Sequence, residues 1–275
     1  MAGYYVDFRV KARTRAWPPP ELEPIDSRLF VAFAQWGLGA YEHFLHGGDE
    51  AWLRAALSAG EFLLARQSEG GEWTHTRPYP HTFDLQPPWV SAMAQGEGAS
   101  LLTRLYRATG EERFADAALR ALAPLAIDSA DGGVRTLLNG RPFYEEYPTR
   151  PPSHVLNGAI FALWGLGDVA FALGDDGARR DFEVGVDSLA ASIDSWDLGW
   201  WTRYDLFPHR VTNVASLAYH ELHIDQLRAM MLVAPRPQLE LALERFIGYR
   251  ASRRCQARAL AANIRFRLLI PRRKR

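Results

Sequence analysis

Glutamates, tyrosines and histidines gather in three stretches of the sequence, and these side chains are among those that enzymes use to move protons. The stretches read FYEEYPTRPPSHVLNG at 143–158, GWWTRYDLFPHR at 199–210 and AYHELHIDQLRAM at 218–230. Carboxyl and phenol groups have ordinary pKa values of ~4.3 and ~10, so burial or neighbouring charges must shift these values before the groups work well near neutral pH. The three stretches are therefore the first candidates for a proton-transfer site.

The first two stretches each have a purely structural interpretation as well. Glu146 and Tyr147 come just before a predicted helix with Ser153 as its expected N-cap, and a loop packed by its own aromatic side chains is the alternative interpretation. In the second stretch, Trp200 and Trp201 are either a stacking wall for a sugar ring or core residues, and core packing is favoured for at least one of them.

The third stretch raises the question of a metal. His220 and His223 are three residues apart on a predicted helix, but no third ligand has a convincing spacing. Hydrogen-bonded or substrate-facing histidines are favoured over a metal site. The sequence has neither a phosphate-binding loop nor a Gly-x-Ser-x-Gly elbow, so we expect no metal, no nucleotide cofactor and no serine hydrolysis.

A repeat of helix pairs is predicted to position the three stretches. The expected pairs are 27–46 with 49–67, 90–108 with 111–126, 154–173 with 176–194, and 214–233 with 237–250. Glycines and other small residues in the first helix of each pair indicate close approach in an inner ring, and the second helices show the wider polar face of an outer ring. About eight helices, with short β segments in the connecting loops, predict an all-α fold, an (α/α)4 toroid around a central cavity.

The 275-residue chain divides into an N-terminal extended segment 1–26, a toroid 27–250 and a basic tail 251–275. Alternation of apolar and polar residues predicts a strand at 3–10. The formal charge of the whole chain is zero, but the tail carries nine basic residues and no acidic one. We expect the tail, helix-compatible at 257–275, to lie against an anionic membrane or uronan chain, with a solvated tail as the alternative.

Targeting signals are not evident. The N-terminus lacks the apolar region of a signal peptide, and no uninterrupted apolar run reaches the ~20 residues of a membrane span. A cytoplasmic location, peripheral to a membrane through the tail, is the expectation. The single cysteine, Cys255, excludes an intramolecular disulfide. No nucleic acid partner is expected, because no reading module accompanies the arginines.

Together with one further stretch, these motifs resemble the C-terminal domain of the D-glucuronyl C5-epimerase family, which acts in heparan sulfate and heparin synthesis. The similarity covers roughly residues 30–250, and the motifs that carry it are WVSAMAQGEG (89–98), EEYPTRPPSHVLNG (145–158), TRYDL (202–206) and YHELHIDQL (219–227). The resemblance implies a uronic-acid polysaccharide as the substrate, inversion at C5 of the glucuronate to an iduronate-type sugar, and no cofactor.

The resemblance also implies the site residues. The family pocket uses a glutamate and tyrosines from these segments, and the matching positions are Glu146, Tyr147, Tyr204 and Tyr219. We expect Glu146 and Tyr219 to be the acid/base pair and the other two tyrosines to position groups or relay protons. Burial is expected to raise the pKa of the glutamate, and a neighbouring Arg or His to lower that of a tyrosine. The expected substrate-binding residues are Arg203, Arg210, Asn157, His154, His220, His223 and Trp201.

Two departures from the family separate this chain from the animal enzymes. Phe207 stands where those enzymes have an arginine that helps to hold the substrate carboxylate, and Arg203 or Arg210 is the expected replacement. The β-rich domains that precede the toroid in the animal enzymes have no counterpart in the roughly 25 residues before the first predicted helix.

Other functions remain compatible with the sequence. A polyuronate lyase shares the C5 proton abstraction, a glycoside hydrolase needs two carboxyl groups about 5–9.5 Å apart, and a non-catalytic uronan-binding protein needs neither. A homodimer is a further state to consider.

Overall fold

The computed structural model describes residues 3–24, 28–78 and 81–272. These residues form nine α-helices: α1 Phe30–Gly47, α2 Glu50–Leu64, α3 Ala92–Thr109, α4 Glu112–Arg120, α5 Leu156–Leu173, α6 Asp176–Ser192, α7 Leu217–Val233, α8 Pro237–Ala251 and α9 Arg253–Leu269. Two antiparallel hairpins pair β1 Thr74–His75 with β2 Trp89–Val90, and β3 Arg135–Leu138 with β4 Arg141–Tyr144. The predicted start of the first helix at residue 27 and the last residues of the tail, 273–275, lie outside the described residues.

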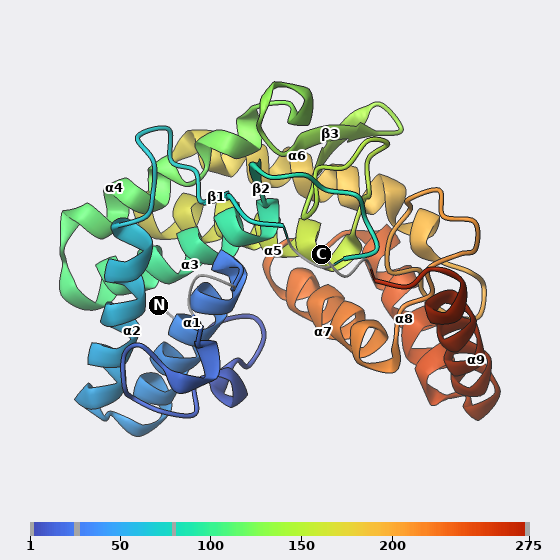
Figure 1. The fold of residues 1–275 in the computed structure, drawn as a ribbon, viewed down its shortest axis with the longest axis horizontal. Coiled ribbons are helices and arrows are strands. Elements are labelled where there is room, and N and C mark those ends of the chain that lie inside the picture. The colour runs from blue at the N-terminus through green and yellow to red at the C-terminus, as the bar shows by residue number, and fades with distance from the viewer. Residues whose placement is uncertain (1–2, 25–27, 79–80, 273–275) are drawn as a thin grey trace.

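The first eight helices follow one another as four pairs around an arc (Figure 1). Helix α3 packs against α1 and α5, and α5 packs against α7, so these four form the inner row. Helices α2, α4, α6 and α8 each pack outside the preceding inner helix. The predicted all-α class and (α/α) toroid arrangement are confirmed, and α9 is a helix beyond the eight that were expected.

Glycine allows the inner helices α3 and α5 to approach at backbone distance. A Cβ built on Gly96 would lie 2.4 Å from the carbonyl oxygen of Phe161, and one on Gly165 would lie 2.4 Å from the Cα of Gly96. No side chain fits there, which accounts for the small residues noted in the sequence. Within the described residues, α5 alone is long and apolar enough to cross a membrane, but 83% of it is buried inside the protein, as in a core helix.

The N-terminal segment contradicts the prediction of a strand at 3–10. Among the described residues it has no strand partner, and it leads into a 3-10 turn at Arg9–Lys11. Its aromatic rings pack on a helix instead of beside a neighbouring strand, because Tyr4 and Phe8 both contact Phe161 of α5. The buried ion pair between Arg104 and Asp168 fixes the segment further: the arginine donates to the carbonyl of Gly3, and the Tyr5 hydroxyl donates to Asp168.

The described part of the basic tail is a docked helix. Phe266 of α9 is fully buried and meets the His209 ring edge-on, and Ala259 is buried as well. The Asn263 amide donates to the carbonyl of Val214 over 2.9 Å, and the Arg258 guanidinium lies 4.0 Å from the centre of the Trp200 ring. Helix α9 therefore has one fixed face, which holds it beside α7 and α8.

Candidate active site

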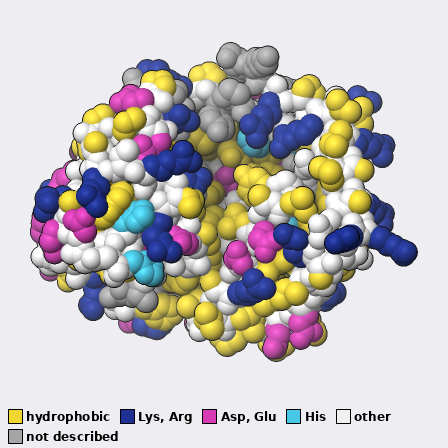
Figure 2. Space-filling view, turned by 90° about the horizontal axis from the view of Figure 1, so that it is seen from below, with side chains coloured by type: hydrophobic (Ala, Val, Ile, Leu, Met, Phe, Trp, Pro, Cys, Tyr) yellow, Lys and Arg dark blue, Asp and Glu magenta, His cyan; other side chains and the backbone are white. Residues whose placement is uncertain are grey.

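A cavity of about 460 Å³ lies in the inner row and is lined by residues of α1, α5, α7 and the N-terminal segment. Figure 2 shows a deep hollow in this face of the molecule, largely apolar inside, with basic side chains gathered around it. Of the predicted site residues, Glu146, Tyr147, Asn157 and Tyr219 line this cavity. Its other polar lining residues are Lys11, Arg28, Gln35 and Ser91.

A second, smaller cavity of about 110 Å³ adjoins the first, and Tyr147 and Tyr219 line both. Tyr204 lines the smaller one. The four residues expected to be catalytic therefore line two neighbouring cavities that share Tyr147 and Tyr219. The remaining polar lining residues of the smaller cavity are His81, Thr82, Asn213, Ser216, Asn263, Arg267 and Arg272.

Glu145 fixes the loop that presents Glu146. Its fully buried carboxylate accepts hydrogen bonds from Thr136 Oγ1 and from the Ser153 hydroxyl and backbone N–H, and His154 Nδ1 lies 2.7 Å from it. The Ser153 side chain is thus occupied by Glu145, and the N-cap of α5 is Val155 without a side-chain cap bond, so the predicted Ser153 cap is wrong. A charge-assisted network of this kind holds the next residue in place.

Backbone hydrogen bonds join the first two predicted stretches. The Leu206 N–H donates to the carbonyl of Ser153, and the Leu156 N–H donates to that of Tyr204. These bonds set Tyr204 beside the start of α5. Its ring in turn meets Tyr219 of α7 edge-on, with ring centres 4.8 Å apart. Residues far apart in the sequence thereby converge on one site.

Burial raises the pKa of Glu146 to about 7, and the charge of Glu145 adds to the rise. Hydrogen bonds from Tyr147 and Asn157 favour the charged form of Glu146 and so limit the rise of its pKa. The Asn157 amide lies 3.5 Å from Glu146 Oε2. Gly158 leaves the space, because a Cβ there would lie 2.6 Å from the same oxygen. A carboxyl group with a pKa near 7 can both accept and return a proton at neutral pH.

The phenol of Tyr204 stays protonated near neutral pH. Burial raises its pKa well above 10, and the negative charge of Glu146 adds to the rise. This direction is opposite to the expected lowering by an Arg or His, because desolvation and a nearby carboxylate outweigh the cations for this ring. Tyr204 is therefore a hydrogen-bond donor in this site.

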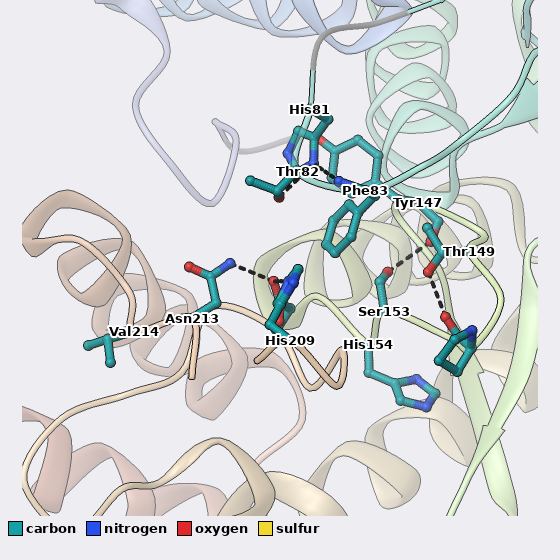
Figure 3. Close-up of polar contacts among 12 residues, drawn as sticks. His81, Thr82, Phe83, Tyr147, Thr149, Ser153, His154, His209, Asn213 and Val214 are labelled. Carbon is teal, nitrogen blue, oxygen red and sulfur yellow. Dashed lines mark hydrogen bonds and ion pairs between the residues drawn. The ribbon is translucent and has the colours of Figure 1, made fainter. Parts of the chain in front are cut away.

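Aromatic rings hold Tyr147 between the cavities. His81 stacks on it with ring centres 4.5 Å apart, and Phe83 and Trp89 pack around it. Figure 3 shows the segment 81–83 lying against Tyr147. Burial lowers the pKa of His81 to about 3, and Arg272 and Arg267 add to the lowering, so this ring is neutral at pH 7.

A second buried carboxyl group lies near Glu146. Glu97 of α3 is fully buried; its Oε1 accepts a hydrogen bond from Gln35 Nε2 at 3.0 Å, whereas its Oε2 has no partner among the described residues. Burial raises the pKa of Glu97 well above its ordinary value, and the charge of Glu146 adds to the rise. Burial therefore favours the protonated form of Glu97, which lies behind the cavity wall.

Several predicted binding residues lie away from both cavities. Trp201 is fully buried and stacks on His220, and the rings of His220 and His223 both lie within hydrogen-bond distance of Thr202 Oγ1. Burial lowers the pKa of the two histidines to about 4 and about 3, so they are neutral packing groups that tie the loop to α7. Among the described residues, no three His, Cys, Asp or Glu side chains form a metal-binding group.

The other predicted binding residues also fall outside the cavity linings. His154 is held by Glu145, while Arg203 and Arg210 line neither cavity. The cations that do line the smaller one are Arg267 and Arg272, which the sequence interpretation assigned to a tail. The spacing of Ala259 and Phe266, two helical turns apart, is the signal that could have indicated a docked helix there.

The sequence is similar to that of known proteins. Residues 67–246 match the family described as D-glucuronyl C5-epimerase C-terminus. The D-glucuronyl C5-epimerase of Caenorhabditis elegans is 33% identical over 225 residues, which is 75% of this chain and 36% of that protein. An uncharacterized protein of Methanocaldococcus jannaschii is 26% identical over 66% of this chain and 62% of its own length. The chain thus spans about a third and about three fifths of these relatives.

Solved structures with the same fold include unsaturated glucuronyl hydrolases. The enzyme from Bacillus sp. GL1 is 16% identical with a TM-score of 0.52, covering 92% of this chain and 65% of that one. The enzyme from Streptococcus agalactiae is 12% identical with a TM-score of 0.53, covering 90% and 70%. At these identities the likeness concerns the toroid fold. The family match over 67–246, with the relative at 33% identity, places the chain in the D-glucuronyl C5-epimerase family.

Proposed function

We propose that this protein inverts C5 of uronic-acid residues in a polysaccharide, converting a D-glucuronate to an L-iduronate type of sugar. The observation that carries the proposal is Glu146, a carboxyl group with a pKa of about 7 that lines the main cavity together with Tyr147 and Tyr219. Family membership supports the reaction class, and the lining of the cavity supports the choice of residues.

The chemistry follows from the position of the reacting hydrogen. One member of the Glu146 and Tyr219 pair removes the C5 proton, and the electron pair of the broken C–H bond moves into the adjacent carboxylate to form an enediolate. The other member delivers a proton to the opposite face of C5, and no bond to a neighbouring sugar is broken. Tyr204 remains protonated and donates a hydrogen bond, and Tyr147 lies next to Glu146, where it can relay protons.

The cavity suits a sugar with an acidic group. Its volume of about 460 Å³ lies within the ~300–1,000 Å³ range of small-molecule sites. Two basic side chains line it: Lys11 from the N-terminal segment and Arg28 from just before α1. A uronic-acid polymer therefore meets both an apolar floor and cations.

A glycoside hydrolase is the second candidate, because the site has a second buried carboxyl group. Retaining and inverting hydrolases use two carboxyl groups, one as an acid and one as a base or nucleophile. Glu97 and Glu146 interact electrostatically and both have raised pKa values. Glu97 does not line either cavity, which favours the epimerase.

Deuterium incorporation tests the proposal. In deuterated water with heparosan, N-sulfated heparosan or another uronan, an epimerase places deuterium at C5 without cutting the chain, and iduronate-type residues appear. A lyase instead produces unsaturated ends that absorb ultraviolet light, and a hydrolase produces reducing ends without C5 label. Absence of C5 label across these polymers, with a folded protein that binds one of them, rejects the epimerase.

A matched pair of tyrosine variants checks the site. Tyr219→Phe is expected to lower exchange by about 10²-fold or more, because it removes the hydroxyl at the cavity. Tyr249→Phe is the control, since the hydroxyl of Tyr249, on α8, donates to Asp197 and Tyr249 lines neither cavity. Equal exchange in the two variants would remove Tyr219 from the mechanism.

A further inference from the structure

The proposed reaction needs a cation on the side of the sugar carboxylate, because negative charge moves onto that group as the C5 proton leaves. In the smaller cavity, where Tyr147, Tyr204 and Tyr219 meet, the charged lining residues are Arg267 and Arg272. Both come from the C-terminal segment, and neither belongs to the four helix pairs.

The docking of α9 gives Arg267 a defined position. The preceding residue, Phe266, is fully buried against His209, and Asn263, one turn earlier, donates to Val214 and itself lines the cavity. Because the contacts of Phe266 and Asn263 fix the backbone of α9, the Arg267 side chain has a defined place in the lining of the smaller cavity. It is not a member of a freely solvated tail.

The electrostatic surroundings of Arg267 match this position. Burial lowers its pKa, the charge of Arg272 adds to the lowering, and Tyr204 and Tyr219 oppose it. In residues 3–24, 28–78 and 81–272, no ion pair involves Arg267. Asp205 is the nearby carboxylate; its Oδ2 accepts a hydrogen bond from Asn213 and lies 3.5 Å from His209 Nε2. Its Oδ1 has no hydrogen-bond partner among the described residues, so Arg267 is not bonded to it. The guanidinium keeps its donors for an incoming anion.

We propose that Arg267, with Arg272 beside it, binds the carboxylate of the reacting uronic acid, so that α9 is part of the substrate site. A guanidinium offers paired donors that match the two oxygens of a carboxylate, and it stabilises the charge as the enediolate forms. This assignment rests on the proposed function. It replaces the expectation that Arg203 or Arg210 fills this role.

Binding measurements with paired ligands test the assignment. The variants are Arg267→Gln, Arg267→Lys and, as the matched control, Arg265→Gln, which removes the same charge from an exposed position on α9 outside both cavities. The ligands are a heparosan oligosaccharide and its carboxyl-reduced form. Calorimetry at low salt measures the affinity of each protein for each ligand. Arg267→Gln is expected to weaken binding of the carboxylated ligand by about tenfold or more and to leave the reduced ligand within about twofold.

The lysine variant separates paired hydrogen bonding from charge. Arg267→Lys is expected to restore part of the affinity but less than all of it, because an ammonium group lacks the planar pair of donors. Equal loss of both ligands in Arg267→Gln would indicate a structural effect on α9 and overturn the assignment. Equal affinities of Arg267→Gln and Arg265→Gln for the carboxylated ligand would also overturn it.

Exchange of deuterium at C5, measured on the same proteins, distinguishes this inference from the proposed function. If the wild type exchanges and Arg267→Gln exchanges as fast as Arg265→Gln, the carboxylate assignment fails and the epimerase stands. If the wild type binds through Arg267 but never exchanges, the epimerase fails and the carboxylate site stands. If the wild type neither binds nor exchanges, both fail.

Discussion

Replacing Glu146 by glutamine should abolish activity and stabilise the protein above neutral pH at the same time. The change preserves the volume of the side chain but removes the group that we propose exchanges a proton, so C5 exchange is expected to fall by about 10²-fold or more. The opposite effect on stability arises because the folded protein holds this carboxyl group in a buried place.

The size of the stability effect follows from the pKa. The pKa of Glu146 is about 7 in the folded protein, against an ordinary value of 4.5. The folded state therefore binds the proton more tightly than the unfolded state, and stability that is fully present below pH 4.5 is lost as the pH rises through 7. At about 1.4 kcal/mol for each pKa unit, the loss is about 3 kcal/mol above pH 8.

Urea unfolding followed by tryptophan fluorescence measures this difference. Between pH 4.5 and pH 8.5, the wild type should lose about 3 kcal/mol more unfolding free energy than Glu146→Gln does. Glu244→Gln, at an exposed position of α8, is the control and should follow the wild type. Parallel pH dependences for the wild type and Glu146→Gln would refute the view that burial sets the pKa of this carboxyl group.

Three other changes have expected outcomes. Gly158→Ala should lower the rate of C5 exchange by at least about tenfold although Glu146 is intact, because the added Cβ would lie 2.4 Å from the Glu146 Cβ. Gly248→Ala is the control and should leave the rate unchanged, since the space around Gly248 is open. Glu97→Gln should keep C5 exchange within about twofold, because Glu97 lines neither cavity and burial favours its uncharged form, which an amide resembles; loss of chain cleavage in this variant would instead favour the hydrolase. Serine in place of the exposed apolar residues Leu260, Ile264 and Leu268 of α9 should lower binding to anionic lipid at low salt by about tenfold, but not binding to uncharged lipid. Vesicle flotation measures both, and unchanged binding would reject membrane contact by the tail.

The helix pairs were predictable because their cause is local. Periodic apolar residues give each helix a buried face, and small residues such as Gly96 and Gly165 allow the inner helices to touch. The alternation at 3–10 led to a wrong prediction of a strand. The same pattern occurs in a segment whose Tyr4 and Phe8 rings pack on one helix, with no partner strand among the described residues. Ser153 misled for a similar reason, because Glu145 takes the hydroxyl that a cap would use.

The candidate site was predictable as far as the motifs reach. Glu146, Tyr147, Tyr204 and Tyr219 lie in stretches that the resemblance marks, and all four line the cavities. Arg267 depends on how α9 docks, and no local pattern states against which surface a helix packs. The position of a cation in a site built from distant segments is a tertiary property.

Segments near the two ends of the described chain supply the cations of the candidate site, and the helix pairs with their loops supply most of its other polar groups. The helix pairs and their loops provide the acids and phenols, whereas Lys11 comes from the N-terminal segment and Arg267 from α9. Because both cations lie on the periphery of the packed ring, substitutions or segment swaps at either end can retune which anionic sugar is accepted without repacking the core. Grafting the equivalent of residues 253–272 between relatives would then transfer ligand preference while leaving the proton chemistry with its original scaffold.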